Sequence, residues 1–564
     1  MNDIRRTVLW VIFTLSLVLL WDQWQVFNGN KATFFPTPQP AATAKAPAGA
    51  SSVPASTVPS ASVSPAPVGT VPGVPTSAAP QPAVASEKIT VSTDVMSVTF
   101  DTEGGSIVRT EFLKHRSDDK QSNVVLLDNA PGNTYLAHSG LIGGDFPNHT
   151  TVMTFSGERQ LKDGANQLSV RFESPEKGGV KLVKTYTLTR GNYDMAVKNE
   201  VINTGAAPVS PQLYLQLVRG AATSGGSFIT NPTGTFTGPA VYTDTSKFQK
   251  IEFSDIEKNK ADFQKESTSG FIAMVQHYFT SAWVLPDGVK REHRVRKESG
   301  ELFSVAMVTP VTVAPGSTQA VNATFFAGPQ EEKVLERVAP GLDLVKDYGI
   351  FTIISKPLYW LLDKLHGFIG NWGWSIMALV LIIKIAFYWL QAKGYESMAK
   401  MKAVNPKVMA MRERYKDNPQ QMQQEMMKIY REEKVNPMGG CLPIMVQIPV
   451  FIALYWVLLS SVEMRGAPWI LWIKDLSTPD PYFILPVVMT LTTLLQTALN
   501  PVPPDPLQAK MMWLMPLAFS VMFFFFPSGL VLYWITNNVL SIAQQWLINV
   551  RMGVPPEFNM PKFK

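Results

Sequence analysis

The chain has 564 residues, of which 46% are hydrophobic and 17% are charged, and its formal net charge is +6. This length is too great for one ordinary domain, and the small net charge gives no basis for nucleic-acid binding, which needs basic residues gathered on one polar face. The single cysteine, Cys441, excludes a disulfide within the chain.

The first predicted element is an apolar run, Thr7–Trp21, that follows two arginines. A segment that spans the hydrocarbon core needs about 20 mainly apolar residues. A cleaved signal peptide is the alternative, but polar residues rather than a small-residue cleavage site follow the run closely. We therefore predict an uncleaved transmembrane anchor in residues 1–26. The Pro-, Ala- and Ser-rich residues 27–86 cannot build a core and are predicted to be a disordered linker.

Residues 87–330 are predicted to form an all-β domain, because short segments of alternating apolar and polar residues replace the linker composition. Leu182, Tyr186 and Leu188, for example, fall on one face of a strand. This period of two, with turn residues between the segments, indicates an antiparallel β-sandwich. Its five histidines show no metal-ligand spacing, and no catalytic motif is present. We expect a scaffold or docking surface, and a ligand site formed by residues that converge in space is the alternative.

Residues 331–371 are predicted to hold connecting helices, the last of them amphipathic and interfacial. Ser355, Lys356 and Pro357 form a helix-start signal. An apolar stripe follows at helical spacing, comprising Leu358, Leu361, Leu362, Leu365, Phe368 and Ile369. Since a predicted span begins directly afterwards, we expect the stripe to lie in the outer membrane interface, with packing on the sandwich as the alternative.

Residues 372–550 are predicted to form a polytopic helical membrane domain. Its five spans are 372–390, 442–462, 482–499, 511–526 and 529–548. Lys and Arg are frequent in residues 391–441 and scarce in residues 463–481, so the positive-inside rule places the first loop and both termini in the cytoplasm. With the anchor this gives six spans, a β domain outside, in the periplasm of a Gram-negative cell, and a short cytoplasmic tail, residues 551–564.

A cytoplasmic helical hairpin, residues 393–440, is predicted between the first two of these five spans. Asn-Pro pairs divide it into helices at about 406–416 and 419–434. Met422 and Met426 share a stripe at helical spacing, and Met409 lies nearby. Because methionine adapts to varied apolar partners, these three residues are candidates for receiving client or partner segments. A plain packing face is the alternative.

One ionisable residue, Lys384, lies inside a predicted span. A lysine at mid-bilayer costs about 3 kcal/mol on insertion scales, so it is a functional candidate unless its stem reaches the cytoplasmic end of the span. Amides in other spans, including Gln447 and Asn537, are predicted to face it across a wet cavity that opens to the cytoplasm. Ordinary hydrogen bonding between helices is the alternative role for these amides.

Three stretches of the chain resemble a known family. They read NPMGGCLPIMVQIPVFIALYWVL (436–458), PWILWIKDLSTPDPYFILP (468–486) and FPSGLVLYWITNN (526–538). They are similar to the YidC/Oxa/Alb insertases, and the order and size of the predicted regions resemble the long Gram-negative form. The resemblance implies five core helices around a water-filled groove, open to the cytoplasm and lipid, and a β-supersandwich outside.

The resemblance also implies a function. The protein would be a membrane insertase and chaperone of the inner membrane, working alone or with a Sec-type translocon, and neither an enzyme nor a user of metals or cofactors. Its implied partners are nascent membrane proteins, the ribosome, a targeting receptor and the lipid bilayer, with no nucleic acid. Two other classes stay open from the residues alone: a transporter or channel, and a membrane-tethered sugar-binding periplasmic protein.

Within this resemblance, five residues are predicted to form the substrate groove. Lys384 takes the position of an arginine in the family, which keeps the charge but loses the bidentate geometry. Gln447 matches a polar residue near the groove, and Tyr533 and Trp534 match an aromatic pair on the last span. Asn537 joins them as a polar residue of the same span. The ending NMPKFK lacks the strongly basic, ribosome-contacting tail of some members.

Overall fold

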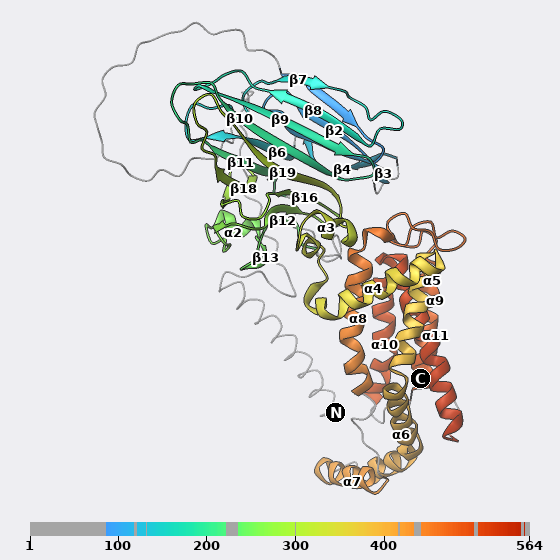
Figure 1. Cartoon of the computed structure of the whole chain (residues 1–564). Coiled ribbons are helices and arrows are strands. Elements are labelled where there is room, and N and C mark those ends of the chain that lie inside the picture. The colour runs from blue at the N-terminus through green and yellow to red at the C-terminus, as the bar shows by residue number, and fades with distance from the viewer. Residues whose placement is uncertain are drawn as a thin grey trace, which may run out of the picture. The chain divides into compact units, whose positions relative to one another are not determined.

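The computed structural model describes residues 86–117, 121–130, 132–221, 235–298, 300–415, 418–433, 442–500, 506–553 and 558. The predicted anchor, almost all of the predicted linker and most of the predicted tail lie outside the described residues. Figure 1 shows a β-rich region followed along the chain by a helical region.

The described strands form two antiparallel sheets, one of ten strands and one of nine. The larger sheet contains β1 (Lys88–Ser92), β2 (Met96–Asp101), β3 (Ser106–Arg116), β4 (Asn123–Val125), β5 (Asp128–Ala130), β6 (Asn133–Ile142), β11 (Gln212–Gly220), β14 (Glu266–Ser267), β17 (Arg291–Lys297) and β18 (Leu302–Pro310). The smaller contains β7 (Thr154–Gly157), β8 (Gln167–Glu173), β9 (Val180–Thr189), β10 (Asp194–Asn203), β12 (Gly238–Thr243), β13 (Lys247–Lys250), β15 (Phe271–Val275), β16 (Phe279–Val284) and β19 (Thr318–Pro329). A short helix, α2 (Phe253–Glu257), follows β13. The predicted antiparallel sandwich is confirmed.

The inward faces of the two sheets share one hydrophobic core. Leu182, Tyr186 and Leu188 are all buried in it, as the alternation in β9 predicts. Each such side chain stabilises the fold by about 1.5–3 kcal/mol through removal of apolar surface from water. Strand β10 pairs with β9 along one edge and with β19 along the other, so the backbone of this central strand is hydrogen-bonded on both sides.

A polar cluster lies inside this sandwich. The ammonium of Lys184, fully buried on β9, donates hydrogen bonds to the backbone oxygens of Gly104 and Ser139 at 2.6 and 2.7 Å. Burial lowers the pKa of Lys184 to about 7. The buried rings of His138 and His149 stack with centroids 4.4 Å apart, and burial lowers the pKa of His149 to about 4. These groups make the stability of the domain dependent on pH.

The helical region begins with connecting elements and continues with longer helices. The connecting elements are α3 (Glu332–Val338), the 3₁₀ turns η1 (Leu342–Val345) and η2 (Gly349–Phe351), and α4 (Thr352–Ile369). The longer helices are α5 (Trp372–Ala386), α6 (Tyr388–Arg414), α7 (Pro419–Glu432), α8 (Leu442–Ser460), α9 (Ile484–Leu499), α10 (Pro506–Met522) and α11 (Ser528–Arg551), with 3₁₀ turns η3 (Val462–Met464) and η4 (Phe523–Phe525).

Helix α4 is apolar on more than one side. Leu362 is fully buried, and Leu358, Leu361 and Leu365 pack against the core of the helical region, which α5, α8 and α11 also build. The exposed face instead carries Ile353, Trp360 and Phe368, which are 90%, 61% and 93% exposed. The predicted stripe is therefore divided, because a helix with two apolar faces has no single direction that its periodicity can fix.

The predicted spans coincide with α5, α8, α9, α10 and α11, although the first is broken. Helices α5 and α6 meet at Phe387 with a bend of 69°. Among the described residues no helix taken alone has both the length and the apolarity for a bilayer crossing, whereas α5 and α6 meet that requirement together. Segments of α8, α9 and α10 with its 3₁₀ extension form shorter apolar helices.

Helices α6 and α7 occupy the region of the predicted hairpin, and the first of them differs in its bounds from the predicted helix. Helix α6 runs without interruption from the bend through Pro406, whereas the Asn-Pro pair predicts a new helix there. Helix α7 begins at the predicted Pro419, and the side chain of Asn418 caps it by accepting a hydrogen bond from the amide of Gln421. Pro406 costs α6 one backbone hydrogen bond, and packing of Val404 and Val408 against α7 offsets that loss.

Candidate functional site

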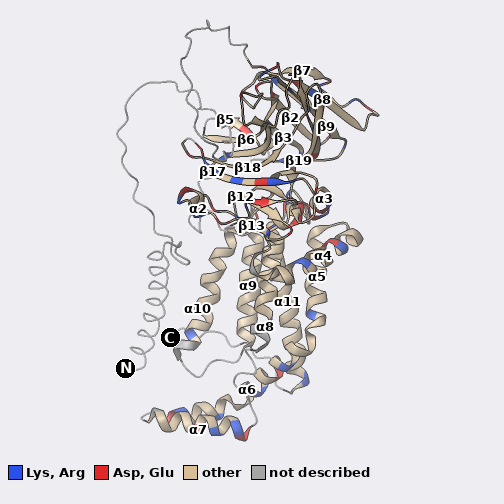
Figure 2. Ribbon diagram, turned by 60° about the vertical axis from the view of Figure 1, so that its left-hand side comes forward, with Lys and Arg blue, Asp and Glu red and all other residues tan. Residues whose placement is uncertain are grey.

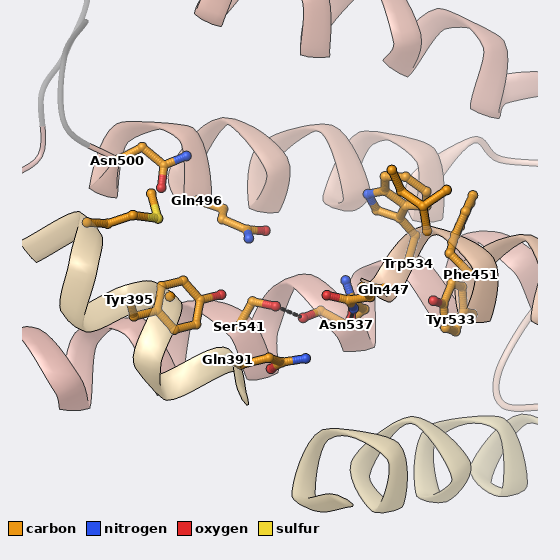
Figure 3. A pocket seen from close by; sticks show the side chains of 13 residues that line it. Gln391, Tyr395, Gln447, Phe451, Gln496, Asn500, Tyr533, Trp534, Asn537 and Ser541 are labelled. Carbon is orange, nitrogen blue, oxygen red and sulfur yellow. Dashed lines mark hydrogen bonds between the residues drawn. The ribbon is translucent and has the colours of Figure 1, made fainter. Parts of the chain in front are cut away.

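The helices of the membrane-type region enclose a cavity of about 260 Å³. It lies among α6, α8, α9 and α11, and Figure 3 shows the side chains that face it. The lining residues are Gln391, Gly394, Tyr395, Met398, Gln447, Ile448, Phe451, Gln496, Asn500, Tyr533, Trp534, Asn537 and Ser541. Neutral polar groups and aromatic rings thus share one enclosure.

Aromatic side chains gather at one end of the cavity (Figure 3). The ring of Phe451 on α8 meets Trp534 on α11 edge to face, with centroids 4.8 Å apart, and lies 5.7 Å from Tyr533. Offset and edge-to-face contacts of this kind each add about 0.5–1.5 kcal/mol beyond burial. The structure places Tyr533 and Trp534 in the cavity wall, where their rings join α11 to α8.

Amide and hydroxyl groups line the rest of the cavity together with Gly394, Met398 and Ile448. The side-chain amide of Gln447 donates to the Oδ1 atom of Asn537 at 3.0 Å, which links α8 to α11. On α11, the Ser541 hydroxyl donates to the backbone oxygen of Asn537 at 2.7 Å. Trp534, Asn537 and Ser541 follow each other at intervals of three and four residues, so one face of α11 supplies all three.

The one predicted groove residue that does not line the cavity is Lys384. It is 7% exposed on α5, and its ammonium donates to the hydroxyl of Ser541 at 2.7 Å and to Oε1 of Gln391 at 3.4 Å. Its charge therefore lies directly behind two residues that do line the cavity. The short bond to Ser541 fixes this position, and the bond to Gln391 shows that the side chain reaches past Ala386, the last residue of α5, to the start of α6. Both partners are neutral, so neither brings a counter-charge to the ammonium.

The three predicted methionines of the α6–α7 hairpin have different surroundings. Met426 packs against Val404 and Val408 of α6, which agrees with the packing alternative. Met422 is half-buried, whereas Met409 is exposed. Met427, which was not predicted, is also exposed. Of the predicted set, Met409 is the one with a largely free apolar surface.

Several lining residues were missed by sequence reasoning. Gln391 and Tyr395 are four residues apart on α6, and that helix reaches the cavity only because the chain bends at Phe387. No proline or glycine marks this break, so the sequence carries no signal for it. Ser541 is a polar residue within an apolar segment, and that mismatch was the available signal for it.

A cluster of three carboxylates outside the cavity has the spacing of a metal site, but hydrogen-bonding partners already occupy two of them. Ligand oxygens of Glu332, Glu336 and Asp343 lie within 4.8 Å of one another. However, the ammonium of Lys356 binds Asp343 at 2.6 Å, and the hydroxyl of Tyr348 donates to Glu332 at 2.9 Å. These partners account for two of the three carboxylates without a cation.

Comparisons with known proteins cover both regions of the chain. A family model described as the YidC periplasmic domain matches residues 88–361, and one described as 60Kd inner membrane protein matches residues 364–554. Proteins described as membrane protein insertase YidC from Cupriavidus necator and Ralstonia nicotianae are 55% and 54% identical over 555 residues, covering 98% of both chains in each case. A crystal structure described as active YidC insertase with the first transmembrane domain resolved is 20% identical, with a TM-score of 0.38, covering 82% of this chain and 92% of that one.

Proposed function

The chain belongs to the YidC family of membrane protein insertases, and on that premise we propose that the cavity among α6, α8, α9 and α11 is the site that receives its clients. The protein is an inner-membrane insertase with a periplasmic β domain, is not an enzyme, and acts on nascent membrane proteins. Because the chain belongs to this family, its function is that of an insertase, and the transporter and sugar-binding alternatives are set aside.

The observation that carries the proposal is a buried cation beside an amide-lined cavity. Moving a polar client segment into hydrocarbon removes its hydrogen bonds to water, at a cost of several kcal/mol for each unsatisfied group. Gln447 and Asn537 offer replacement donors and acceptors, and the cavity has room for several water molecules. The polar part of a client then crosses part of the membrane without losing all of its hydrogen-bonding partners.

The charge of Lys384 favours acidic client segments. A unit charge acts strongly over a few ångströms where the effective dielectric constant is about 20 or lower. Gln391 is the weaker of its two partners, at 3.4 Å, so a client carboxylate that displaces this amide reaches the ammonium directly. The hydroxyl of Ser541 keeps the ammonium oriented toward the cavity while this exchange takes place.

The aromatic end of the cavity suits the apolar part of a client. Phe451, Tyr533 and Trp534 present ring surfaces from α8 and α11. An apolar client helix that slides along these two helices keeps dispersion contacts as it moves toward lipid. We propose that the polar segment enters the cavity while the apolar helix follows this route.

We propose the predicted membrane topology on the distribution of charge. In Figure 2, charged residues are frequent on α6 and α7 and few on α8, α9 and α11. This supports five core spans, formed by α5 with the start of α6 and by α8, α9, α10 and α11, with a cytoplasmic hairpin and cytoplasmic termini. The exposed apolar face of α4, which contains Ile353, Trp360 and Phe368, fits contact with the outer leaflet.

The proposed partners beyond the client follow from the exposed surfaces of the hairpin. Exposed Met409 and basic residues of α6 and α7 suit contact with a ribosome, a targeting receptor or anionic lipid headgroups. A Sec-type translocon is proposed as a further partner for clients with several spans.

Reconstitution tests the proposed site. The full chain in liposomes should insert a small single-span client with an acidic polar segment, scored by protection from added protease. Replacing both Gln447 and Asn537 by Leu should remove most of this insertion while leaving the protein folded. Undiminished insertion by that variant would exclude the cavity as the client site.

A further inference from the structure

Three buried side chains and a partly buried carboxylate form a cluster at the outer end of α8, which we name the outer clamp: Lys346, Tyr348, Tyr359 and Glu463. The side chain of Lys346 has no exposed surface, and its ammonium lies 3.4 Å from Glu463 Oε2. The same ammonium lies 3.9 Å from the centroid of the Tyr359 ring, and the Tyr359 hydroxyl donates to Glu463. The Glu463 carboxylate thus forms an ion pair with Lys346 and accepts a hydrogen bond from Tyr359.

The members of the outer clamp come from separate segments. Lys346 follows η1 in the segment that leaves the β domain, Tyr359 belongs to α4, and Glu463 lies in η3 just after α8. The hydroxyl of Ser355 on α4 also donates to the backbone oxygen of Ala453 on α8 at 3.3 Å. Two different contacts therefore join the connecting segment and α4 to the outer half of α8.

The backbone of the connecting segment also lies close against α8. A Cβ atom added at Gly349 would stand 2.7 Å from Nε1 of Trp456, and φ at Gly349 is +66°. Only glycine meets both conditions without a shift of the indole or strain in the backbone. This close approach is a third independent link to α8, and it involves no charge.

Helix α8 supplies one wall of the cavity through Gln447, Ile448 and Phe451. We propose that Lys346, Tyr359 and Glu463 are positioning residues, which fix the outer end of α8 and thereby the place of this wall. The inference rests on the proposed function only in assigning the wall a role in insertion. A buried ion pair that loses one partner leaves an uncompensated charge, whereas loss of both charges is close to neutral. The clamp therefore holds α8 as a pair and not as two separate charges.

Thiol labelling tests the clamp in the full chain, in liposomes and without a client. In a Cys441→Ser background, one cysteine is placed at Ile448 on α8 or at Gln496 on α9. We expect Glu463→Gln and Lys346→Met each to change the labelling rate at position 448 by about threefold or more, because the remaining buried charge drives the segments apart. The rate at position 496 should stay at its original value.

Three further variants sharpen this test. The double variant Lys346→Met with Glu463→Gln should return labelling at position 448 toward the original rate. Tyr359→Phe, which removes only a hydroxyl, should act in the same direction as Glu463→Gln but more weakly. The matched control is Lys333→Met: Lys333 pairs with Asp363 at 2.8 Å but is 76% exposed, so its loss should change neither rate.

The outcomes separate the clamp from the proposed function. Unchanged labelling at position 448 in both single variants, or equal changes at positions 448 and 496, would overturn the clamp. If labelling at 448 changes as expected while insertion of a single-span client continues at its normal rate, the clamp stands. The cavity would then fail as the client site.

Discussion

The ammonium of Lys384 lies 2.7 Å from the hydroxyl of Ser541, although 157 residues separate them along the chain. The bond joins α5 to α11 and places a positive charge behind the wall of the cavity. The same hydroxyl donates to the backbone of α11, so its lone pair is directed at the ammonium. A neutral serine thus fixes the position of the charge.

Removal of this hydroxyl should weaken both stability and insertion. Ser541→Ala leaves the buried ammonium with the longer bond to Gln391, and we expect a loss of about 1–3 kcal/mol in unfolding free energy. Unfolding in detergent and the protease-protection assay measure the two effects. Ser520→Ala on α10 is the control, because that hydroxyl bonds only within its own helix, and it should behave as the original protein. Equal losses in the two variants would remove the special role of Ser541.

The sign of the charge at position 384 should select clients. Lys384→Glu places a negative charge behind the cavity, and insertion of a client with an acidic segment should fall by about tenfold or more. Lys384→Arg, which keeps the charge, should retain most of the activity. The assay compares clients whose polar segments differ only in charge. Equal insertion of the acidic client by the Glu and Arg variants would refute the electrostatic part of the mechanism.

Gln447 and Asn537 should show energetic coupling. Each single change to Leu leaves one buried amide without its partner, whereas the double change removes both amides. A double-mutant cycle on unfolding free energies should give a coupling of about 1 kcal/mol. Additive losses in that cycle would mean that the two amides do not hold each other in the membrane.

Lys184 should make the β domain more stable as the pH rises from about 7 to 10.5. Burial lowers the pKa of its ammonium from 10.5 to about 7, so in this range the unfolded chain binds a proton that the folded domain does not. The penalty is complete below pH 7, amounts to a few kcal/mol, and disappears above the unfolded pKa. Denaturant unfolding followed across this range should show the rise, and Lys184→Met should abolish it. A flat profile in the original chain would contradict the assignment.

The buried histidines should act in a lower pH range. Burial lowers the pKa values of His149 and His293 from 6.5 to about 4. Below pH 6.5 the unfolded chain takes up protons that the folded domain excludes, so stability should fall as the pH drops from about 6.5 to 4. The same unfolding experiment measures this decline. Lys184→Met serves as its control, because that variant should lose the alkaline rise but keep most of the acid decline, since burial is the larger cause of the lowered pKa of His149 and Lys184 does not act on His293.

The close approach at Gly349 should be visible in a matched pair of alanine variants. Both Gly349 and Gly370 have positive φ, at +66° and +72°, but a Cβ at Gly370 meets nothing within 4 Å. Gly370→Ala should therefore cost about 1 kcal/mol of backbone strain, and Gly349→Ala clearly more, because Trp456 must also move. Thermal unfolding compares the two. Equal losses of stability in the two variants would show that the Trp456 indole moves away from the added methyl group at no cost.

The sequence was sufficient for features that repeat along the chain. Alternation in segments such as β9 predicted the sandwich, and apolar runs predicted the helices of the membrane domain. The same alternation puts Lys184 on the buried face between Leu182 and Tyr186, although a lysine in a strand ordinarily faces solvent. A local pattern could not reveal the contact of Lys384 with Ser541, which depends on how two distant helices pack. The structure brings Gln447, Tyr533, Trp534 and Asn537 together in one cavity wall, and their role in receiving a client stays a prediction.

The break between α5 and α6 has a geometric consequence. Lys384 precedes the break, while Gln391 and Tyr395 follow it, so the charge and part of the cavity lining stand on opposite sides of one joint. Because Gln391 and Tyr395 belong to α6, rotation of this helix about Phe387 would change the width of the cavity and the tilt of the α6–α7 hairpin together.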